Sequence, residues 1–215
     1  MKKCIALLFL LVLLAGCAAG GRRVVRGEGP RVPFTLAVAD FTGLSVSGGF
    51  DLTFRQGPFS VELEIQENLY ELMEATVVNG VLELGFSRTI STTASNTPRL
   101  TIYAPDLQEL RVSGAVSGNM QLAVDALYIN IAGAANLTLG GSATQLEIHS
   151  AGAANVNAFN LRTVDAVISV AGAGSVDVYA SGTLDVSIAG VGHVRYDGDA
   201  VLTRSVAGLG SIRQR

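Results

Sequence analysis

A short glycine-centred segment recurs six times in the second half of this chain and limits the possible folds more than any other feature. The copies are VSGAVSG, IAGAANL, SAGAANV, VAGAGSV, IAGVGHV and VAGLGSI. Their leading glycines, at spacings of 19, 19, 20, 18 and 18 residues, are Gly114, Gly133, Gly152, Gly172, Gly190 and Gly208. A seventh copy, VSGGFDL around Gly48, precedes them. A repeat of about 19 residues is typical of proteins built from stacked units.

Both sides of each glycine show the alternation of a β-strand. Before Gly133, for example, Leu127, Ile129 and Ile131 alternate with polar residues, and helical three-and-four spacing is absent. One repeat is therefore predicted as a strand, a tight corner, a second strand and a return. We expect an all-β fold: a single-domain parallel β-helix, or solenoid, with coils of about 19 residues and right-handed by default. A β-sandwich is the alternative.

Glycine at each corner is expected to let the chain turn, because glycine reaches positive φ without steric cost. A polar residue lies three positions after each glycine. This corner column comprises Asp51, Ser117, Asn136, Asn155, Ser175, His193 and Ser211. Stacked polar side chains can bond one another or the corner backbone, so we expect the column to be structural.

The first residues are typical of an export signal. Two lysines precede the apolar run Ile5–Ala15, which is too short to span a bilayer as a mature helix. The sequence LAGC resembles the lipobox of bacterial lipoproteins, which implies that Cys17 is lipidated and begins the mature chain; an ordinary secretory signal is the alternative. We predict a signal peptide over residues 1–16, a flexible tether over 17–33 and the folded domain over 34–215.

Removal of the signal changes the charge and cysteine content. Thirteen basic residues, all arginine, then face eighteen acids, giving a net charge of 13 − 18 = −5. Nucleic acid is excluded as a partner, because its binding requires a basic face. Cys17 would be the single mature cysteine, so no disulfide framework and no cysteine metal cluster is expected.

Residues 34–105 keep the strand pattern without the short period. Asn79-Gly80 predicts a hairpin and ENLYELM (67–73) a helical turn. This less regular β region is expected to cover the N-terminal end of the solenoid. Arg213 and Arg215 are expected at the last exposed edge, where charge discourages edge-to-edge pairing.

The polar residues form no recognisable catalytic pattern. AGAGS and AGLGS are too short for a P-loop and lack its lysine, and no G-x-S-x-G elbow occurs. His149 and His193 fall on different sides of a corner, so no shared metal site is expected. Asp177 next to Arg195 is expected to be a surface ion pair. We predict no enzyme, cofactor or metal; a β-helical polysaccharide lyase or hydrolase is the enzymatic alternative.

Several segments together resemble a known family. The order FTGLSVSGGFDLTFRQG, SVELEIQENLYELM, VVNGVLEL and RLTIYAPDLQELRVSGA, followed by repeated AGA, resembles the auto-transporter adhesin head GIN domain family. The resemblance covers about Phe34 to Ser211, and its most specific part is Tyr103–Leu107 followed by Ser113–Ala115. It implies a β-helical exported lipoprotein and carries over no catalytic residue.

The sequence therefore predicts a non-enzymatic envelope lipoprotein. Membrane attachment is expected through the lipid on Cys17, and Ala18 resembles outer-membrane sorting in a Gram-negative bacterium, with the domain facing the periplasm or the surface. The expected activity is adhesin-like binding of a glycan or protein through the sheet faces. A structural envelope protein that assembles through its solenoid is the alternative, and self-association is left open.

Overall fold

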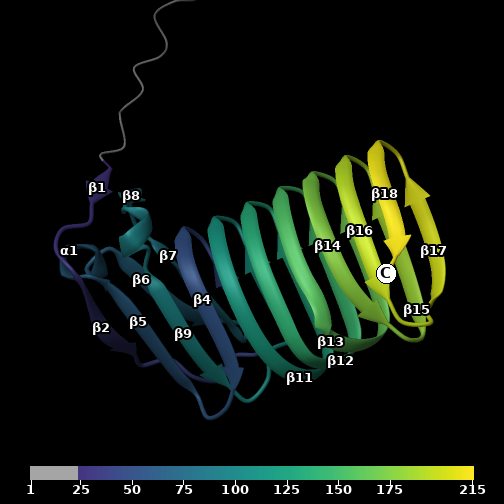
Figure 1. Cartoon of the computed structure of the whole chain (residues 1–215). Coiled ribbons are helices and arrows are strands. Elements are labelled where there is room, and N and C mark those ends of the chain that lie inside the picture. Colours follow the sequence, from purple (N-terminus) through teal and green to yellow (C-terminus); the bar gives the residue numbers. More distant parts are fainter. Residues whose placement is uncertain (1–23) are drawn as a thin grey trace, which may run out of the picture.

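The computed structural model describes residues 24–215. These residues form an elongated parallel β-solenoid, which confirms the predicted fold class (Figure 1). The predicted signal peptide and Cys17 lie outside the described residues. No helix within residues 24–215 is long and apolar enough to cross a membrane.

The first part of the solenoid consists of short strands with two small helices. They are β1 (Val25–Arg26), β2 (Arg31–Leu36), β3 (Gly43–Val46), β4 (Gly49–Gln56), β5 (Ser60–Gln66), α1 (Glu67–Tyr70), β6 (Met73–Val78), β7 (Val81–Phe86), β8 (Ile90–Ser91), the 3-10 helix η1 (Ala94–Asn96), β9 (Arg99–Ala104) and β10 (Glu109–Val112).

The repeated coils supply the remaining strands. They are β11 (Ala115–Ile131), β12 (Ala134–Ser150), β13 (Ala153–Val170), β14 (Ala173–Ala180), β15 (Thr183–Ile188), β16 (Val191–Asp197), β17 (Val201–Val206) and β18 (Leu209–Gln214). β4, β11, β12, β13, β14, β16 and β18 each begin directly after a predicted corner glycine. The repeat thus sets the strand boundaries.

Two sheets enclose the core. The front sheet, which faces the viewer in Figure 1, has the order β2-β5-β9-β4-β11-β12-β13-β14-β16-β18. The back sheet has the order β6-β7-β3-β10-β11-β12-β13-β15-β17. The long strands β11, β12 and β13 continue around the second corner and therefore belong to both sheets. Pairing is antiparallel only where β2, β5 or β6 takes part, near the N-terminal end.

The glycine corners stack directly on one another. The carbonyl of each corner glycine accepts a hydrogen bond from the residue that follows the next corner glycine, as in Ala134 N to Gly114 O at 2.8 Å and Ala153 N to Gly133 O at 3.0 Å. The same bond joins every successive pair of corners from Gly48 to Gly208. The backbone ladder therefore passes through the corners without a break.

This stacking, rather than positive φ, explains most of the corner glycines. Among them, φ lies in the left-handed region only at Gly48 (119°) and Gly208 (151°). A Cβ atom at Gly152 would lie 1.9 Å from Gly133 O, and one at Gly133 would lie 2.0 Å from Gly114 O. The expectation that the glycines are needed for a positive φ is thus wrong for the middle corners. There is simply no room for a side chain between one coil and the next.

Aliphatic columns fill the interior, as the alternation predicted. One fully buried column of the back sheet comprises Leu44, Leu110, Ile129, Ile148, Ile168 and Val186. Large aromatic side chains of the core, Phe41, Phe50 and Phe54, gather at the N-terminal end. The interior of the regular coils is instead filled mainly by Val, Ile, Leu and Ala.

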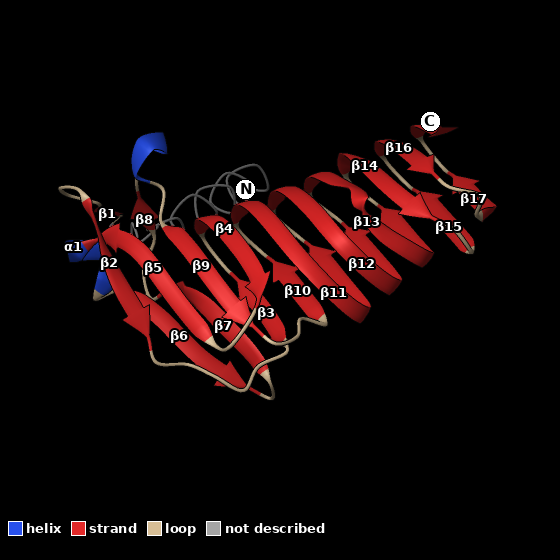
Figure 2. Ribbon diagram, turned by 60° about the horizontal axis from the view of Figure 1, so that its bottom comes forward, coloured by secondary structure: helices blue, strands red, loops and turns tan. Residues whose placement is uncertain are grey.

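The less regular N-terminal region covers its end of the solenoid (Figure 2). The predicted hairpin is formed by β6 and β7, with Asn79 and Gly80 at φ 52° and 78°, and the predicted helical turn is α1. The folded part begins earlier than Phe34, however. β1 pairs with β8 in a separate two-stranded sheet, and β2 pairs with β5 from Arg31 onward, so residues 25–26 and 31–33, expected as tether, are in strands.

The C-terminal coil leaves one edge of each sheet open. Val201, Val206 and Leu209 are 72%, 44% and 77% exposed. Arg204 occupies the position that Val186 and Ile168 fill in the two preceding coils, where the side chain points inward. A charge at an inward position of an edge strand opposes further strand addition.

We expect Gly152→Ala to destabilise the domain by at least about 2 kcal/mol, because the new Cβ would overlap the carbonyl below and force the coils apart. Gly49→Ala is the matched control. A Cβ at Gly49 meets only Ala115 O at 4.0 Å, and its register partner is already an alanine. Urea unfolding of both variants tests this; equal stability of the two would contradict the stacking explanation.

Ser150 offers a second test of the core. It is 3% exposed, and it lies between Ile131 and Val170 in a buried column. Its Oγ has no hydrogen-bond partner among the described residues. Ser150→Ala should raise the free energy of unfolding by about 1 kcal/mol, because it removes an unsatisfied buried hydroxyl. Ile131→Ala should lower it by about 2–5 kcal/mol. A loss of stability in Ser150→Ala would show that the hydroxyl has a hydrogen-bond partner in solution.

Candidate binding face

The corner column lies in register along the front sheet. Strand pairing places Asp51 beside Ser117, and each later member beside the next, through to Ser211. Their side chains alternate with the buried ones and point outward; Asn136 and Asn155 are exposed. The predicted members thus form one continuous line across seven strands.

Hydrogen bonds within this line are rare. Across residues 24–215, one bond joins two members of the column, between His193 Nδ1 and Ser211 Oγ at 2.8 Å. The bonding along the column that a purely structural role would require is therefore largely missing. Ser117, Asn136 and Asn155 present their hydroxyl and amide groups to solvent rather than to one another.

A shallow groove runs beside the corner column. Its floor is a ledge of exposed small residues directly after the corner glycines, Ala115, Ala134, Ala153 and Ala173, with Gly49 at its start. Thr92 and Thr97, on either side of η1, line it at the N-terminal end. The groove has a volume of about 690 Å³ and opens along the front sheet. Residues of five successive coils thus contribute to the groove.

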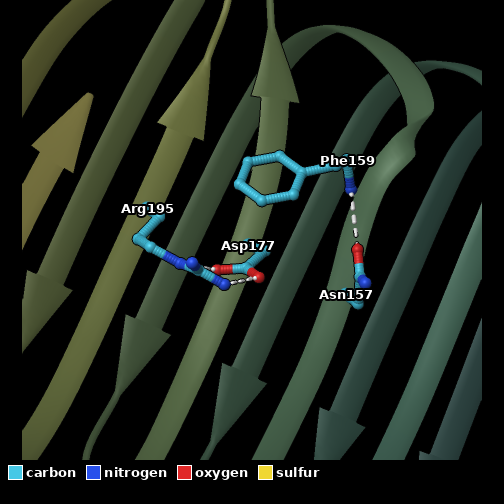
Figure 3. A network of polar contacts seen from close by, with 4 residues as sticks. All are labelled: Asn157, Phe159, Asp177 and Arg195. Carbon is cyan, nitrogen blue, oxygen red and sulfur yellow. Dashed lines mark hydrogen bonds and ion pairs between the residues drawn. The ribbon is translucent and has the colours of Figure 1, made fainter. Parts of the chain in front are cut away.

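A second polar line lies two residues further along each strand. This outer column comprises Thr53, Asn119, Thr138, Asn157, Asp177, Arg195 and Arg213. Asp177 and Arg195 form the predicted ion pair, with Arg195 Nε donating to Asp177 Oδ1 at 2.7 Å and Nη2 donating to Oδ2 (Figure 3). The hydrogen bond and the charge of Asp177 raise the pKa of Arg195 above its ordinary value.

Phe159 reaches this part of the face through an irregularity in β13. The register between β13 and β14 shifts between Ala158 and Arg162. The Phe159 N–H donates to Asn157 Oδ1 at 3.4 Å, and the ring extends over the neighbouring strand towards Asp177 and Arg195 (Figure 3). Sequence reasoning missed this residue. The 20-residue spacing between Gly152 and Gly172, the longest in the series, was the available signal.

The back sheet carries a different cluster. Glu147 and His149 on β12 are hydrogen-bonded, and the ring of Tyr128 on β11 lies 5.5 Å from that of His149. Asn130 Nδ2 donates to the Tyr128 hydroxyl at 3.2 Å. His149 and His193 are thus on opposite sheets, as their spacing predicted. Within the described part of the chain, no three His, Cys, Asp or Glu side chains gather to hold a metal ion.

Two further hollows have a volume of about 760 Å³ each. One is lined at the N-terminal end by Ser47–Gly49 and Phe86–Ile90, and the other at the second corner by Gln56, Asp106 and Arg162 among others. The first is bounded by loops of the N-terminal region, and the second includes stacked residues of β11, β12 and β13. The front groove differs from both in running beside the corner column.

The fold and its outer columns define an all-β solenoid protein with an extended polar face. The chain belongs to the family described as "Putative auto-transporter adhesin, head GIN domain", which its sequence matches over residues 40–200. The resemblance proposed from the sequence is thereby confirmed. No curated protein matches the chain in sequence.

Two crystal structures share this fold. One is named a putative adhesin from Bacteroides fragilis; it is 20% identical, with a TM-score of 0.69 over 89% of this chain and 100% of that one. The other is named a putative adhesin from Parabacteroides merdae; it is 21% identical, with a TM-score of 0.53 over 89% of this chain and 98% of that one. At these identities the likeness establishes the fold alone.

Proposed function

We propose that this protein is a non-enzymatic, adhesin-like binding protein that holds a glycan along its front sheet. The observation that carries the proposal is the corner column: seven polar side chains in register, mostly uncharged, with one hydrogen bond between members in the described structure. Successive members are about one strand spacing, 4.8 Å, apart. This is close to the length of one sugar ring in an extended polysaccharide.

The groove beside the column suits a glycan better than a protein. Hydroxyl and amide side chains exchange hydrogen bonds with sugar hydroxyls as donor and acceptor. The floor of Ala134, Ala153 and Ala173 lets a flat chain approach closely. Protein interfaces are instead enriched in large aromatic anchors and methionine at their centre, which this ledge lacks.

Attachment to the envelope completes the proposal. The family is described as adhesin-like, which favours an envelope or surface location. We propose that Cys17 carries the lipid that holds the domain at the outer membrane. Several acyl chains, at about 0.8 kcal/mol per buried methylene, would hold it stably.

The binding face is tested with two variants around one corner. Ala153 lies on the groove floor and Ala151 on the other side of Gly152, and both are exposed. Ala153→Tyr should weaken glycan binding at least about tenfold by filling the groove, whereas Ala151→Tyr should leave it unchanged. The measurement is a glycan array followed by calorimetry, on the full chain carrying Cys17→Ser.

The proposed binding face would be contradicted if Ala153→Tyr and Ala151→Tyr changed glycan affinity equally, or if the protein bound no glycan in a broad panel. Thermal melting of both variants checks that each remains folded. Depolymerisation of a bound polysaccharide would contradict the non-enzymatic assignment.

The anchor is tested separately. Cys17→Ser should move the protein from the membrane fraction to the soluble fraction and abolish incorporation of an alkyne-labelled fatty acid, because the thiol is the acylation site. Arg22→Gln, in the predicted tether, serves as a control and should change neither result. Retention of label in the serine variant would rule out Cys17.

A further inference from the structure

We propose that the C-terminal end of the front sheet binds the carboxylate or sulfate group of an acidic glycan, at a site formed by Arg195, Arg213 and Arg215 around Phe159. This inference rests on the proposed function, since it names the kind of glycan that the front sheet would hold. It starts from a contrast of charge: a chain with a formal net charge of −3 places three arginines close together here.

Two of the three arginines pack against one aromatic ring, and the third is a strand neighbour of one of them. The Cζ atoms of Arg195 and Arg215 lie 5.6 and 5.1 Å from the centre of the Phe159 ring. Arg213 is the register neighbour of Arg195 on β18. When the flat face of a guanidinium packs against an aromatic ring, its N–H groups, which lie in the guanidinium plane, remain able to donate to an oxyanion. Phe159 thus packs against Arg195 and Arg215 without taking up N–H donors, although Arg195 already donates two hydrogen bonds to Asp177.

In the described part of the chain, the carboxylates nearby pair with one arginine of this cluster and leave the other two unpaired. Asp177, 11% exposed in its side chain, is engaged by Arg195. Asp197 accepts a hydrogen bond from the backbone N–H of Gly198. Within residues 24–215, Arg213 and Arg215 form no ion pair with any carboxylate. The side chains of Arg213 and Arg215 are thus left without a hydrogen-bonded carboxylate among the described residues.

The adjacency of Arg195 and Arg213 is itself costly. Like charges directly opposite one another on neighbouring strands destabilise a sheet. Every other neighbouring pair of the outer column, from Thr53 to Asp177, avoids two like charges. A bound anion between the two guanidiniums removes the repulsion, and charge-assisted hydrogen bonds make such a contact strong.

The site also continues the proposed glycan path. Asn157 and Asp177 lie in the outer column next to this site, on strands whose alanine and glycine residues line the groove. An extended polysaccharide lying across the front sheet would therefore place its hydroxyls at the corner column and an acidic group at Phe159. The anion fixes the position of the chain, and the neutral columns add contacts along its length.

The test uses oligogalacturonate and its fully methyl-esterified form, which differ in charge at the carboxyl group. Both are titrated calorimetrically against the full chain carrying Cys17→Ser. We expect the acid to bind at least about tenfold more tightly than the ester, and Arg213→Gln to remove most of that difference. Arg204→Gln is the matched control: it removes the same charge from the same coil, but on the back sheet, and should change affinity by less than about twofold.

Equal affinity for the acid and the ester would overturn the anion site, and so would an equal loss of affinity from Arg204→Gln and Arg213→Gln. The site would also be overturned if the protein bound vesicles containing phosphatidylglycerol in an Arg213-dependent way and did not bind the oligosaccharide. Phe159→Leu keeps the irregular β13 segment apolar and should weaken acid binding without lowering the melting temperature appreciably.

The same titrations separate this inference from the proposed groove. If Ala153→Tyr leaves acid binding intact while Arg213→Gln abolishes it, the groove assignment fails and the anion site stands. If Ala153→Tyr abolishes binding of both probes while Arg213→Gln has no effect, the anion site fails and the groove stands.

Discussion

The close approach of one glycine backbone to the next is the contact on which this solenoid depends. From Gly114 to Gly208 a carbonyl lies about 2 Å from where a Cβ would be, so these corners admit no side chain, and their backbone bonds continue the ladder from coil to coil. A buried backbone without partners would be costly, so an unbroken ladder is what makes so sharp a turn stable. The alanines beside the glycines keep the same corner narrow.

The sequence was sufficient to predict the repeat, the strands and their stacking, because the period and the alternation are encoded in every coil. It was not sufficient to predict why Gly133 or Gly152 is a glycine, since close approach between coils depends on distances that a linear pattern does not contain. The corner column was placed correctly by its spacing from the glycines. That His193 and Ser211 are its one hydrogen-bonded pair among residues 24–215 depends on side-chain positions that the spacing does not contain.

Two further differences between the sequence-based prediction and the structure arise from how strands pair. Phe159 enters the front face through a local change of register in β13, and a single extra residue in one spacing gives no direction for the extruded side chain. Residues 25–33 are arginine- and glycine-rich, yet β1 and β2 pair with strands far along the chain. Such long-range pairing can override an unpromising local composition.

Stacking in register also gives this molecule a modular length. Each regular coil contacts only the coils on either side, so a whole coil duplicated between Gly133 and Gly152 would meet neighbours of the kind that it has now. The N-terminal strands and the coil with Arg204 would remain unchanged at the two ends. Gain or loss of coils could therefore lengthen or shorten the molecule during evolution by one strand spacing at a time, altering its reach while its cross-section stays constant.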